Sequence, residues 1–272
     1  MKNMLKGKVA VITGASSGIG LAIANKIHKE GVIVYDISKV VVKHDCIKNG
    51  YEADVNDNEN VSKILENIFE VEGHIDIFIN NAGFGIAGAI EYSKPVNVYN
   101  QINTNLSAYI VLSGLAIKYL KKSKGRIVNI SSVGGVIPLP FQATYSATKA
   151  GVEIFSRALS NEVKPYGMKV TAVLPGDTKT GFTAARVIDN NVENKSQKDD
   201  IRASIAKMEK DEQKGMTPDS VAKVVVKVLK KKRPPLRVTV GFQYKCVAIL
   251  PRLLSTKFIN FVVRKLYCKK AK

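Results

Sequence analysis

The architecture of this chain follows from the stretch Val9-Ala10-Val11-Ile12-Thr13-Gly14-Ala15-Ser16-Ser17-Gly18-Ile19-Gly20. Its first five residues form a short apolar run typical of a buried strand, and residues from about 19 to 29 have the pattern of a helix. Glycines in the turn between them allow the backbone to approach a ligand closely, and the free N–H groups at a helix start favour negative charge. The turn is therefore a candidate phosphate-binding site.

Short apolar runs alternate with amphipathic helical stretches along the chain, at residues 9–13, 32–35, 75–80, 126–130, 170–174 and 237–240. Runs that are apolar on both faces suit a parallel sheet covered by helices on each side. We therefore predict an α/β fold in which residues 1–272 form a single doubly wound parallel-sheet Rossmann domain. Ligands of such a sheet bind at the carboxyl ends of its strands.

The chain has 272 residues, 45% of them hydrophobic, which is enough for one substantial core. Its cysteines, Cys46, Cys246 and Cys268, include no Cys-x-x-Cys pair, and its histidines lack a metal-ligand spacing. We therefore predict neither a disulfide framework nor a metal site. The basic N-terminus leads into the first strand without a signal-peptide core, which favours a cytoplasmic location.

The formal net charge of +19 is typical of a solubilising basic surface, and it also suits an anionic membrane or an acidic protein partner. We expect no nucleic-acid partner, because the sequence has no zinc finger, aromatic–basic RNA motif or basic-region zipper.

Tyr145 and Lys149 lie four residues apart, a spacing that puts both side chains on one face of a helix. A free phenol has a pKa of about 10, and a neighbouring ammonium group favours the phenolate. The pair is therefore a candidate acid–base catalyst, although a solvated helix face can show the same spacing.

Four motifs occur in order: Thr13-Gly14-x-x-x-Gly18-x-Gly20, Asn80-Asn81-Ala82-Gly83, Ser132 after Ile127-Val128-Asn129-Ile130-Ser131, and Tyr145-x-x-x-Lys149. With these motifs the chain resembles the short-chain dehydrogenase/reductase family, including its hydroxysteroid dehydrogenase-like members, over nearly its whole length. The resemblance implies an NAD(P)-dependent oxidoreductase that transfers a hydride between nicotinamide and a secondary alcohol or ketone.

The resemblance implies the catalytic residues Asn105, Ser132, Tyr145 and Lys149. In the oxidation direction Tyr145, as phenolate, would take the alcohol proton, while Lys149 lowers the Tyr145 pKa and binds the nicotinamide ribose. Ser132 would hydrogen-bond the substrate oxygen. Asn105 would hold a water that relays protons to Lys149, with Asn103 as the alternative register.

The expected cofactor contacts lie on the glycine-rich turn, on the two following strand ends and on the segment after the strand at 170–174. They are Gly14, Ser16, Ser17, Gly18, Ile19, Gly20, Asp36, Asp54, Val55, Asn81, Ala82, Gly83, Tyr145, Lys149, Pro175, Gly176, Thr178 and Thr180. Asp177 and Thr178 replace the more usual apolar or aromatic pair of the family.

Asp36 is expected to end the second strand, sixteen positions after Gly20. A carboxylate there can accept hydrogen bonds from the adenosine ribose and repel a 2′-phosphate, which favours NAD over NADP. The alternative is that Asp36 only caps a turn, and that Lys39 or Lys43 holds a phosphate instead.

The residues expected around the substrate are mostly apolar, with no obvious arginine to grip a carboxylate: Phe84, Gly85, Ile86, residues 133–140, Phe141 and Phe182. A hydrophobic ketone or alcohol, such as a hydroxysteroid, is therefore our leading expectation. Two alternatives remain open. One is a 3-oxoacyl-carrier-protein reductase, whose acidic partner would suit the basic surface, and the other is a dinucleotide sensor without turnover.

Two segments are distinctive. The polar stretch at about 178–215 is expected to be a substrate lid or a disordered segment, followed by a helix that begins at Thr217-Pro218. In the basic segment at about 245–272, apolar residues recur at helical spacing over 251–267, which predicts an interfacial helix, a cover over the pocket or a subunit contact. A homo-oligomer, dimer or tetramer, is implied by the family resemblance.

Overall fold

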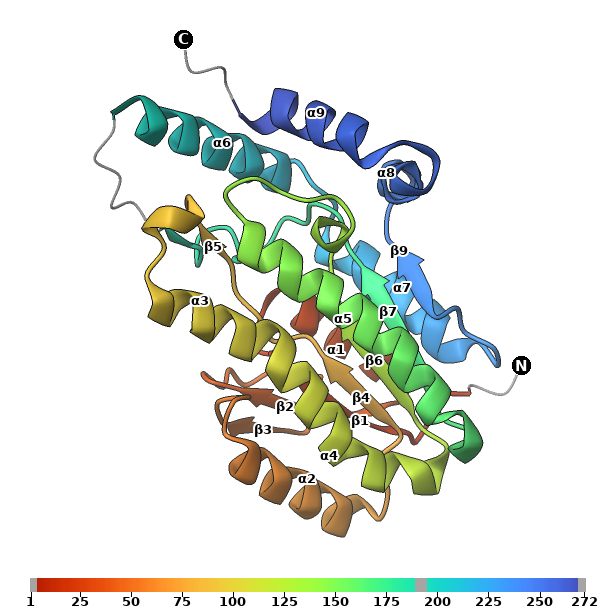
Figure 1. Cartoon of the computed structure of the whole chain (residues 1–272). Coiled ribbons are helices and arrows are strands. Elements are labelled where there is room, and N and C mark those ends of the chain that lie inside the picture. The colour runs from red at the N-terminus through yellow and green to blue at the C-terminus, as the bar shows by residue number, and fades with distance from the viewer. Residues whose placement is uncertain (1–3, 189–194, 269–272) are drawn as a thin grey trace.

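The computed structural model describes residues 4–188 and 195–268 of the chain. Seven parallel strands form the central sheet in the order β3-β2-β1-β4-β6-β7-β9. The strands are β1 (Val9–Thr13), β2 (Ile33–Ser38), β3 (Asn49–Glu52), β4 (Ile77–Asn80), β6 (Arg126–Ile130), β7 (Lys169–Leu174) and β9 (Arg237–Thr239). The strand order reverses between β1 and β4, so the predicted doubly wound parallel sheet is confirmed (Figure 1).

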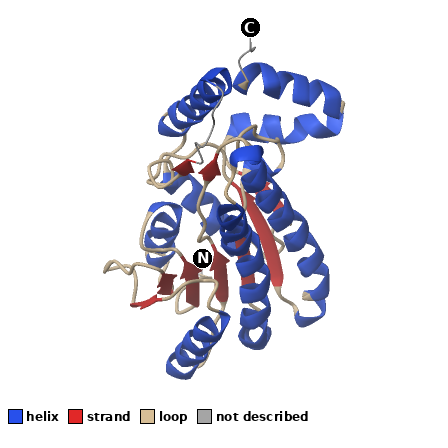
Figure 2. Cartoon of the chain, turned by 60° about the vertical axis from the view of Figure 1, so that its left-hand side comes forward, coloured by secondary structure: helices blue, strands red, loops and turns tan. Residues whose placement is uncertain are grey.

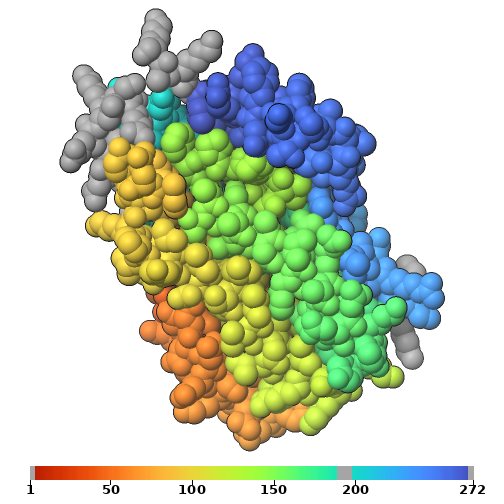
Figure 3. Space-filling view, viewed as in Figure 1, coloured from red at the N-terminus to blue at the C-terminus, as the bar shows by residue number. Residues whose placement is uncertain are grey.

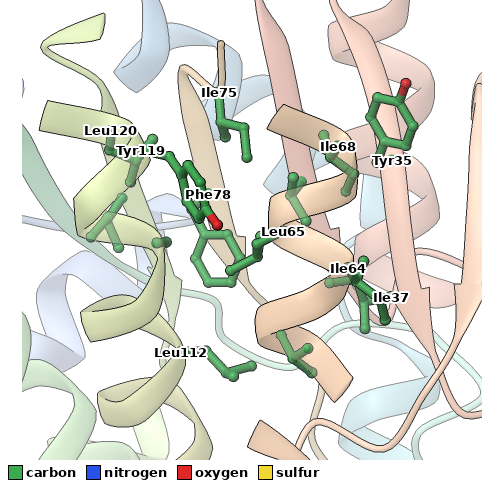
Figure 4. Close-up of a cluster of buried hydrophobic side chains, with 14 of the residues drawn as sticks. Tyr35, Ile37, Ile64, Leu65, Ile68, Ile75, Phe78, Leu112, Tyr119 and Leu120 are labelled. Carbon is green, nitrogen blue, oxygen red and sulfur yellow. The ribbon is translucent and has the colours of Figure 1, made fainter. Parts of the chain in front are cut away.

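Helices cover both faces of the sheet (Figures 1 and 2). One face is covered by α1 (Gly18–His28) and α7 (Pro218–Lys230), which bury apolar side chains such as Ile23 and Val225 against it. The other face is covered by α2 (Asn58–Glu72), α4 (Ala108–Ser123) and α5 (Ala143–Glu162). Figure 4 shows Phe78 of the sheet packed between Leu65 of α2 and the side chains of α4. These two apolar layers hold the strand ends in fixed positions.

One strand of the central sheet, β3, was not predicted from the apolar runs, and neither were the two strands of the small second sheet described below. The sequence of β3 is Asn49-Gly50-Tyr51-Glu52, and none of its residues is fully buried, because β3 lies at the edge of the sheet. A polar edge strand has no continuous apolar run by which to recognise it.

A long helical stretch runs from α3 (Pro95–Ile102) through a turn of π-helix (Asn103–Ser107) into α4. Three single turns of 3₁₀ helix occur at Ile90–Tyr92, Val133–Gly135 and Lys164–Tyr166. A second, two-stranded sheet pairs β5 (Ile86–Ala87) with β8 (Val187–Ile188). Both the π-helical turn and the small sheet lie beside the carboxyl end of the main sheet.

Three helices lie over that carboxyl end (Figures 1 and 3): α6 (Lys195–Gln213), α8 (Phe242–Leu253) and α9 (Thr256–Tyr267). The expected lid thus consists of a turn, β8 and α6, and its residues 189–194 lie outside the described part. The expected continuous helix over 251–267 is wrong in one respect. The chain breaks at Leu254, and Ser255 caps a new helix by accepting a hydrogen bond from the Phe258 N–H at 3.3 Å. Within residues 4–188 and 195–268, no helix has the length and apolar character needed to cross a bilayer.

Candidate active site

Tyr145, Lys149 and Ser132 meet at the carboxyl end of β6. The first two lie in the opening turns of α5, and Ser132 follows β6. The Lys149 Nζ atom is 5.9 Å from the centroid of the Tyr145 ring. Ser132 contributes a hydrogen bond to the Tyr145 side chain, and its Oγ accepts one from the Gly134 N–H at 3.0 Å. The predicted helical pairing of Tyr145 with Lys149 is therefore present, and it faces Ser132.

Burial is the largest influence on the pKa values of Tyr145 and Lys149. Burial raises the pKa of Tyr145 to about 12, against the opposing effect of the Ser132 hydrogen bond. Burial also lowers the pKa of Lys149 to about 7, because the charged ammonium is poorly solvated there. Lys149 donates to the backbone oxygen of Ile130 at 2.9 Å and to the Tyr109 hydroxyl at 3.4 Å. Desolvation is the largest effect on the Tyr145 pKa, and the expected lowering by Lys149 stays a prediction.

Asn105 lies in the π-helical turn and is completely buried, whereas Asn103 in the same turn is exposed. The Asn105 side chain binds Phe84 twice: Oδ1 accepts from the backbone N–H at 3.1 Å and Nδ2 donates to the backbone oxygen at 2.8 Å. A Cβ atom added at Gly83 would lie 3.0 Å from Asn105 Oδ1 and 3.8 Å from Lys149 Nζ. Of the two registers, only Asn105 therefore lies beside Lys149.

The glycine-rich turn has the geometry expected of an anion cradle. Gly14 and Gly18 have positive φ angles of 72° and 56°, which L side chains rarely adopt. A Cβ atom at Gly20 would lie 2.1 Å from the backbone oxygen of Gly14, so only glycine fits there. At the start of α1, Ser17 makes no side-chain cap and the first turn has no acidic residue. Its backbone N–H groups, including those of Gly18, Ile19 and Gly20, thus suit a pyrophosphate.

Asn81 ties this turn to β4. Its Nδ2 donates to the backbone oxygens of Thr13 and Gly14, each at 3.0 Å. The backbone N–H groups of Asn81 and Ala82 both donate to Thr13 Oγ1. Asn80, by contrast, is buried and donates to Asn129 and Ser113, so it joins strands rather than facing the site.

Asp36 does not lie where the sequence predicted. It is inside β2, which continues to Ser38, and it is completely buried. Its carboxylate accepts hydrogen bonds from the Ala15 N–H at 2.7 Å, from Ser16 Oγ at 2.6 Å and from Ser38 Oγ. These contacts hold the glycine-rich turn in place and use the lone pairs that a ribose would need.

The exposed end of β2 carries Lys39 instead. Lys39 Nζ lies 2.8 Å from Asp54 Oδ2, and both side chains are accessible to solvent. This contact and hydrogen bonds from Asn56 lower the Asp54 pKa, against the effect of desolvation. Val55, the neighbouring expected contact, is buried in the core below. A cation and a carboxylate thus stand together where the adenosine half of a dinucleotide is expected.

The segment after β7 closes the other side of the turn. A Cβ atom at Gly18 would lie 3.7 Å from Thr180 Cβ, so this segment crosses the start of α1. The Pro175 oxygen accepts from Val133, and the Gly176 oxygen accepts from Thr178 Oγ1. Tyr244 of α8 packs over Gly176 and donates its hydroxyl hydrogen to Asp177 at 2.8 Å. Asp177 is thereby engaged by the C-terminal helices.

The segment expected to form a lid carries a polar cluster next to Tyr145. The Phe182 ring meets the Tyr145 ring edge-on, with centroids 5.9 Å apart. Next to it Arg186 pairs with Glu212 of α6, and Thr183 donates to the same carboxylate. Arg186, which the sequence expectation did not include, therefore lies next to Phe182, one of the residues expected around the substrate.

Sequence reasoning missed three further groups around the site. Tyr109 lies four residues after Asn105 on the same helical stretch, and burial raises its pKa above the ordinary value. Arg186 and Glu212 lie 26 positions apart, in a stretch that reads as a polar insert. Only the helical spacing from Asn105 pointed to Tyr109, and nothing local pointed to the Arg186–Glu212 pair.

Two cavities are lined in part by sequence neighbours of Tyr145, namely Thr144 in one and Ser146 in the other. The Phe141 cavity, of about 370 Å³, is lined by Ile86, Ala89, Gln101, Phe141, Ala143 and Thr144, among others. The α9 cavity, of about 530 Å³, lies between α9 and the loop before α5, with Gly134, Val136, Leu139, Ala147 and Val263 in its lining. Gly134 also borders the Ser132 and Tyr145 side chains. Space for an apolar substrate therefore lies on both sides of the loop before α5.

Chemistry that moves a hydride needs a site for a dinucleotide and a nearby group that transfers a proton, and both meet here at one end of a doubly wound sheet. That arrangement defines a nicotinamide-dependent oxidoreductase. The family model described as short chain dehydrogenase matches residues 8–191. The chain belongs to the short-chain dehydrogenase/reductase family, and it is an NAD(P)-dependent oxidoreductase acting on CH–OH groups.

Its similarity extends to proteins of different substrates. It is 37% identical to the 3-ketodihydrosphingosine reductase of Bacteroides thetaiotaomicron, over 87% of this chain and 89% of that protein. It is also 37% identical to the 3-oxoacyl-[acyl-carrier-protein] reductase FabG of Pseudomonas aeruginosa, over 66% of this chain and 77% of that protein. Among solved structures, a short-chain dehydrogenase from Streptomyces avermitilis superposes with a TM-score of 0.78 at 25% identity, covering 95% of this chain and 96% of that one.

Proposed function

We propose that the enzyme reduces the ketone of a long-chain aliphatic substrate, of the 3-ketodihydrosphingosine type, to a secondary alcohol. The observation that carries this proposal is the α9 cavity, an apolar space whose lining includes Gly134, the residue that borders the Ser132 and Tyr145 side chains. The 37% identity to a 3-ketodihydrosphingosine reductase over most of both chains supports the same substrate class.

The catalytic residues in this proposal are Asn105, Ser132, Tyr145 and Lys149. The nicotinamide, when bound, supplies the hydride. Ser132 holds the substrate oxygen by a hydrogen bond, and Tyr145 donates its hydroxyl proton to that oxygen. A Tyr145 with a raised pKa keeps its proton at neutral pH, which suits the reduction direction.

Lys149 and Asn105 support Tyr145 in two ways. Lys149 Nζ, close to Gly83, is in reach of the nicotinamide ribose and holds a proton that can replace the one lost by Tyr145. Asn105 lies between Gly83 and Phe84 and would hold a water on the same proton path. The remaining cofactor contacts are those expected from the sequence, apart from Asp36.

The choice between NAD and NADP rests, in this proposal, on Lys39 rather than Asp36. A buried carboxylate with its lone pairs occupied by Ala15, Ser16 and Ser38 does not bind a ribose, so the expected preference for NAD loses its main basis. Lys39 is 65% exposed in its side chain and would exchange Asp54 for a phosphate. NADP(H) is therefore the favoured cofactor.

The C-terminal helices extend the proposal to substrate delivery. Apolar side chains of α8 and α9 face solvent, among them Leu253 at 74% and Phe258 and Phe261 at 50% exposure. Lys257, Arg264 and Lys265 add positive charge beside them. This face suits the surface of an anionic membrane, in which long-chain ketones dissolve. Binding to anionic liposomes that weakens as salt rises would support it, and equal binding to neutral liposomes would contradict it.

A second candidate is the reduction of 3-oxoacyl groups on an acyl carrier protein. The similarity to FabG and the net charge of +19, which would attract an acidic carrier, both favour it. A hydroxysteroid also suits an apolar pocket and stays in the test as a third substrate.

The test is a ketone screen in which consumption of NADPH or NADH is followed by absorbance. The panel contains 3-ketodihydrosphingosine, a 3-oxoacyl thioester with and without its carrier protein, and a ketosteroid. The proposal predicts the highest kcat/KM for 3-ketodihydrosphingosine. A preference for the carrier-linked thioester or the steroid would contradict it.

A further inference from the structure

Arg186 is the most unusual side chain at the site that the mechanism does not use. Its side chain is only 1% exposed, and its Nη2 atom is paired with Glu212. Its Nε and Nη1 atoms are buried and, among the residues that the structure describes, have no hydrogen-bond partner. Buried guanidinium donors are normally satisfied, since a donor left unpaired has lost its hydrogen bonds to water without replacing them.

The unpaired donors lie on the substrate side of the catalytic residues. A Cβ atom at Gly85 would be 3.6 Å from Arg186 Nε and 3.0 Å from the Phe182 ring. Gly85 comes two residues after Gly83, which borders Asn105 and Lys149. The Arg186 guanidinium is 6.0 Å from the Phe182 ring, and that ring contacts Tyr145 edge-on. The Phe182 ring therefore contacts both Arg186 and the ring of Tyr145, whose hydroxyl group takes part in the reaction.

The charge around Arg186 narrows what it can bind. Glu212 already neutralises the guanidinium, and Asp177 acts on Tyr145 together with these two groups. A carboxylate or phosphate on the substrate would add a negative charge that Arg186, which is already paired with Glu212, could not balance. A neutral acceptor oxygen, in contrast, would satisfy the free N–H groups without changing the charge balance.

We propose that Arg186 determines specificity by donating hydrogen bonds to a second, uncharged oxygen of the substrate, a few bonds from the ketone. The proposal rests on the proposed function, since it names the part of that substrate which Arg186 recognises. In 3-ketodihydrosphingosine the carbon next to the carbonyl bears an amino group and the following carbon bears a hydroxyl, which supplies that oxygen. Glu212 and Asp177 give the negative surroundings that suit the amino group.

The test compares two ketones in wild type and Arg186→Met, a change that keeps much of the side-chain length but removes the donors. One ketone is 3-ketodihydrosphingosine, and the other is its analogue lacking only the hydroxyl. The ratio of their kcat/KM values should fall about 10- to 100-fold in Arg186→Met, as expected for lost hydrogen bonds from a charged donor. Arg202→Met, at an exposed arginine of the same lid, should leave the ratio unchanged.

Arg186→Lys keeps the charge and one donor, so it should recover part of the ratio and serves if Arg186→Met does not fold. Equal losses for both ketones would overturn the proposal and make Arg186 a structural partner of Glu212. A wild type that reduces neither ketone would contradict the proposed function instead. In that case calorimetry measures the dissociation constants of the same two ketones for wild type and for Arg186→Met. If the ratio of the two dissociation constants is the same in both proteins, the proposal for Arg186 is overturned.

Discussion

At the scale of single residues, the site depends on how burial sets two protonation states. Tyr145 is held protonated and Lys149 is held close to losing its charge, with pKa values of about 12 and 7 in the cofactor-free enzyme. Both shifts arise mainly from desolvation, because Lys149 contacts Tyr109 and a backbone oxygen rather than a carboxylate. Near neutral pH the lowered pKa of Lys149 therefore costs stability, whereas Tyr145 is protonated in both the folded and unfolded states and adds no such cost.

Lys149→Met should make that cost visible. The folded pKa of Lys149 is below its ordinary value of 10.5, so the unfolded state binds more protons between about pH 7 and 10.5. The contribution of Lys149 to stability is therefore fully present above pH 10.5 and is lost as pH falls toward 7. Near neutral pH, cofactor-free Lys149→Met should melt at a higher temperature than wild type, while kcat falls at least about 100-fold.

The measurement is a series of thermal melts between pH 7 and 9 for both proteins. The difference in melting temperature should shrink as pH rises, because wild-type Lys149 loses its charge. A difference that stays constant with pH would mean that Lys149 is not destabilised by burial.

Lys39→Ala tests the origin of cofactor preference. Loss of the ammonium group should weaken NADPH binding about tenfold and leave NADH binding nearly unchanged, because only NADPH carries the 2′-phosphate. Lys63→Ala, a change at an exposed lysine of α2, is the matched control. The assignment fails if both cofactors weaken equally or if wild type binds NADH more tightly than NADPH.

At the scale of helices and strands, α9 and the loop before α5 form one functional unit around the α9 cavity. Val263 of α9 lines this cavity and is 7% exposed, whereas its neighbour Val262 points outward. Cys268 also lines the cavity, and Cys246 on α8 is exposed. In each pair, Val263 with Val262 and Cys268 with Cys246, the first residue lines the cavity and the second is exposed on the same or the neighbouring helix. An effect seen only at the first residue therefore reports occupation of the cavity.

Val263→Trp should fill the cavity and raise KM for a long-chain ketone about tenfold or more, because each buried methylene contributes about 0.8 kcal/mol. A short ketone should be affected much less, and Val262→Trp should affect neither.

In wild type, dihydrosphingosine should slow maleimide labelling of Cys268 but not of Cys246, as measured by peptide mass spectrometry. Labelling of Cys268 at an unchanged rate would show that the aliphatic chain lies elsewhere, for example in the Phe141 cavity.

The sequence was sufficient for features set by local pattern and insufficient for those set by distant contacts. The apolar runs predicted six strands and their parallel arrangement, and the Tyr145–Lys149 spacing predicted a shared helix face. Asp36 was misplaced because offset from the glycine-rich turn does not reveal that Ser16 and Ser38 enclose it. The Arg186–Glu212 pair escaped notice because its residues lie 26 positions apart in a stretch whose polar composition is typical of an insert.

At the scale of the whole molecule, the outer face of α4 and α5 is unusually apolar for a solvent-facing surface. Ile110 and Val111 of α4 are 42% and 38% exposed, and Ile154 of α5 is 60% exposed. These helices are those through which the family resemblance implies a dimer or tetramer. We therefore expect this face to bury itself against a second copy of the chain.

Ile154→Glu should disrupt that contact, because a two-fold interface would bring two buried carboxylates near each other. Light scattering should then report a monomer where wild type gives a dimer or tetramer. Val71→Glu, on the outer side of α2 at 61% exposure in the wild type, is the control and should not change the mass. A monomeric wild type would remove the expectation altogether.

The most direct test of the catalytic assignment is kcat for Tyr145→Phe in the reduction of 3-ketodihydrosphingosine, with cofactor binding measured on the same preparation. The change removes one hydroxyl group, and thus the proton donor, while the ring keeps its contact with Phe182. We predict a loss of kcat of at least about 1,000-fold, with NADPH affinity within about twofold of wild type. A folded Tyr145→Phe enzyme with near wild-type kcat would contradict the assignment of Tyr145 as the proton donor.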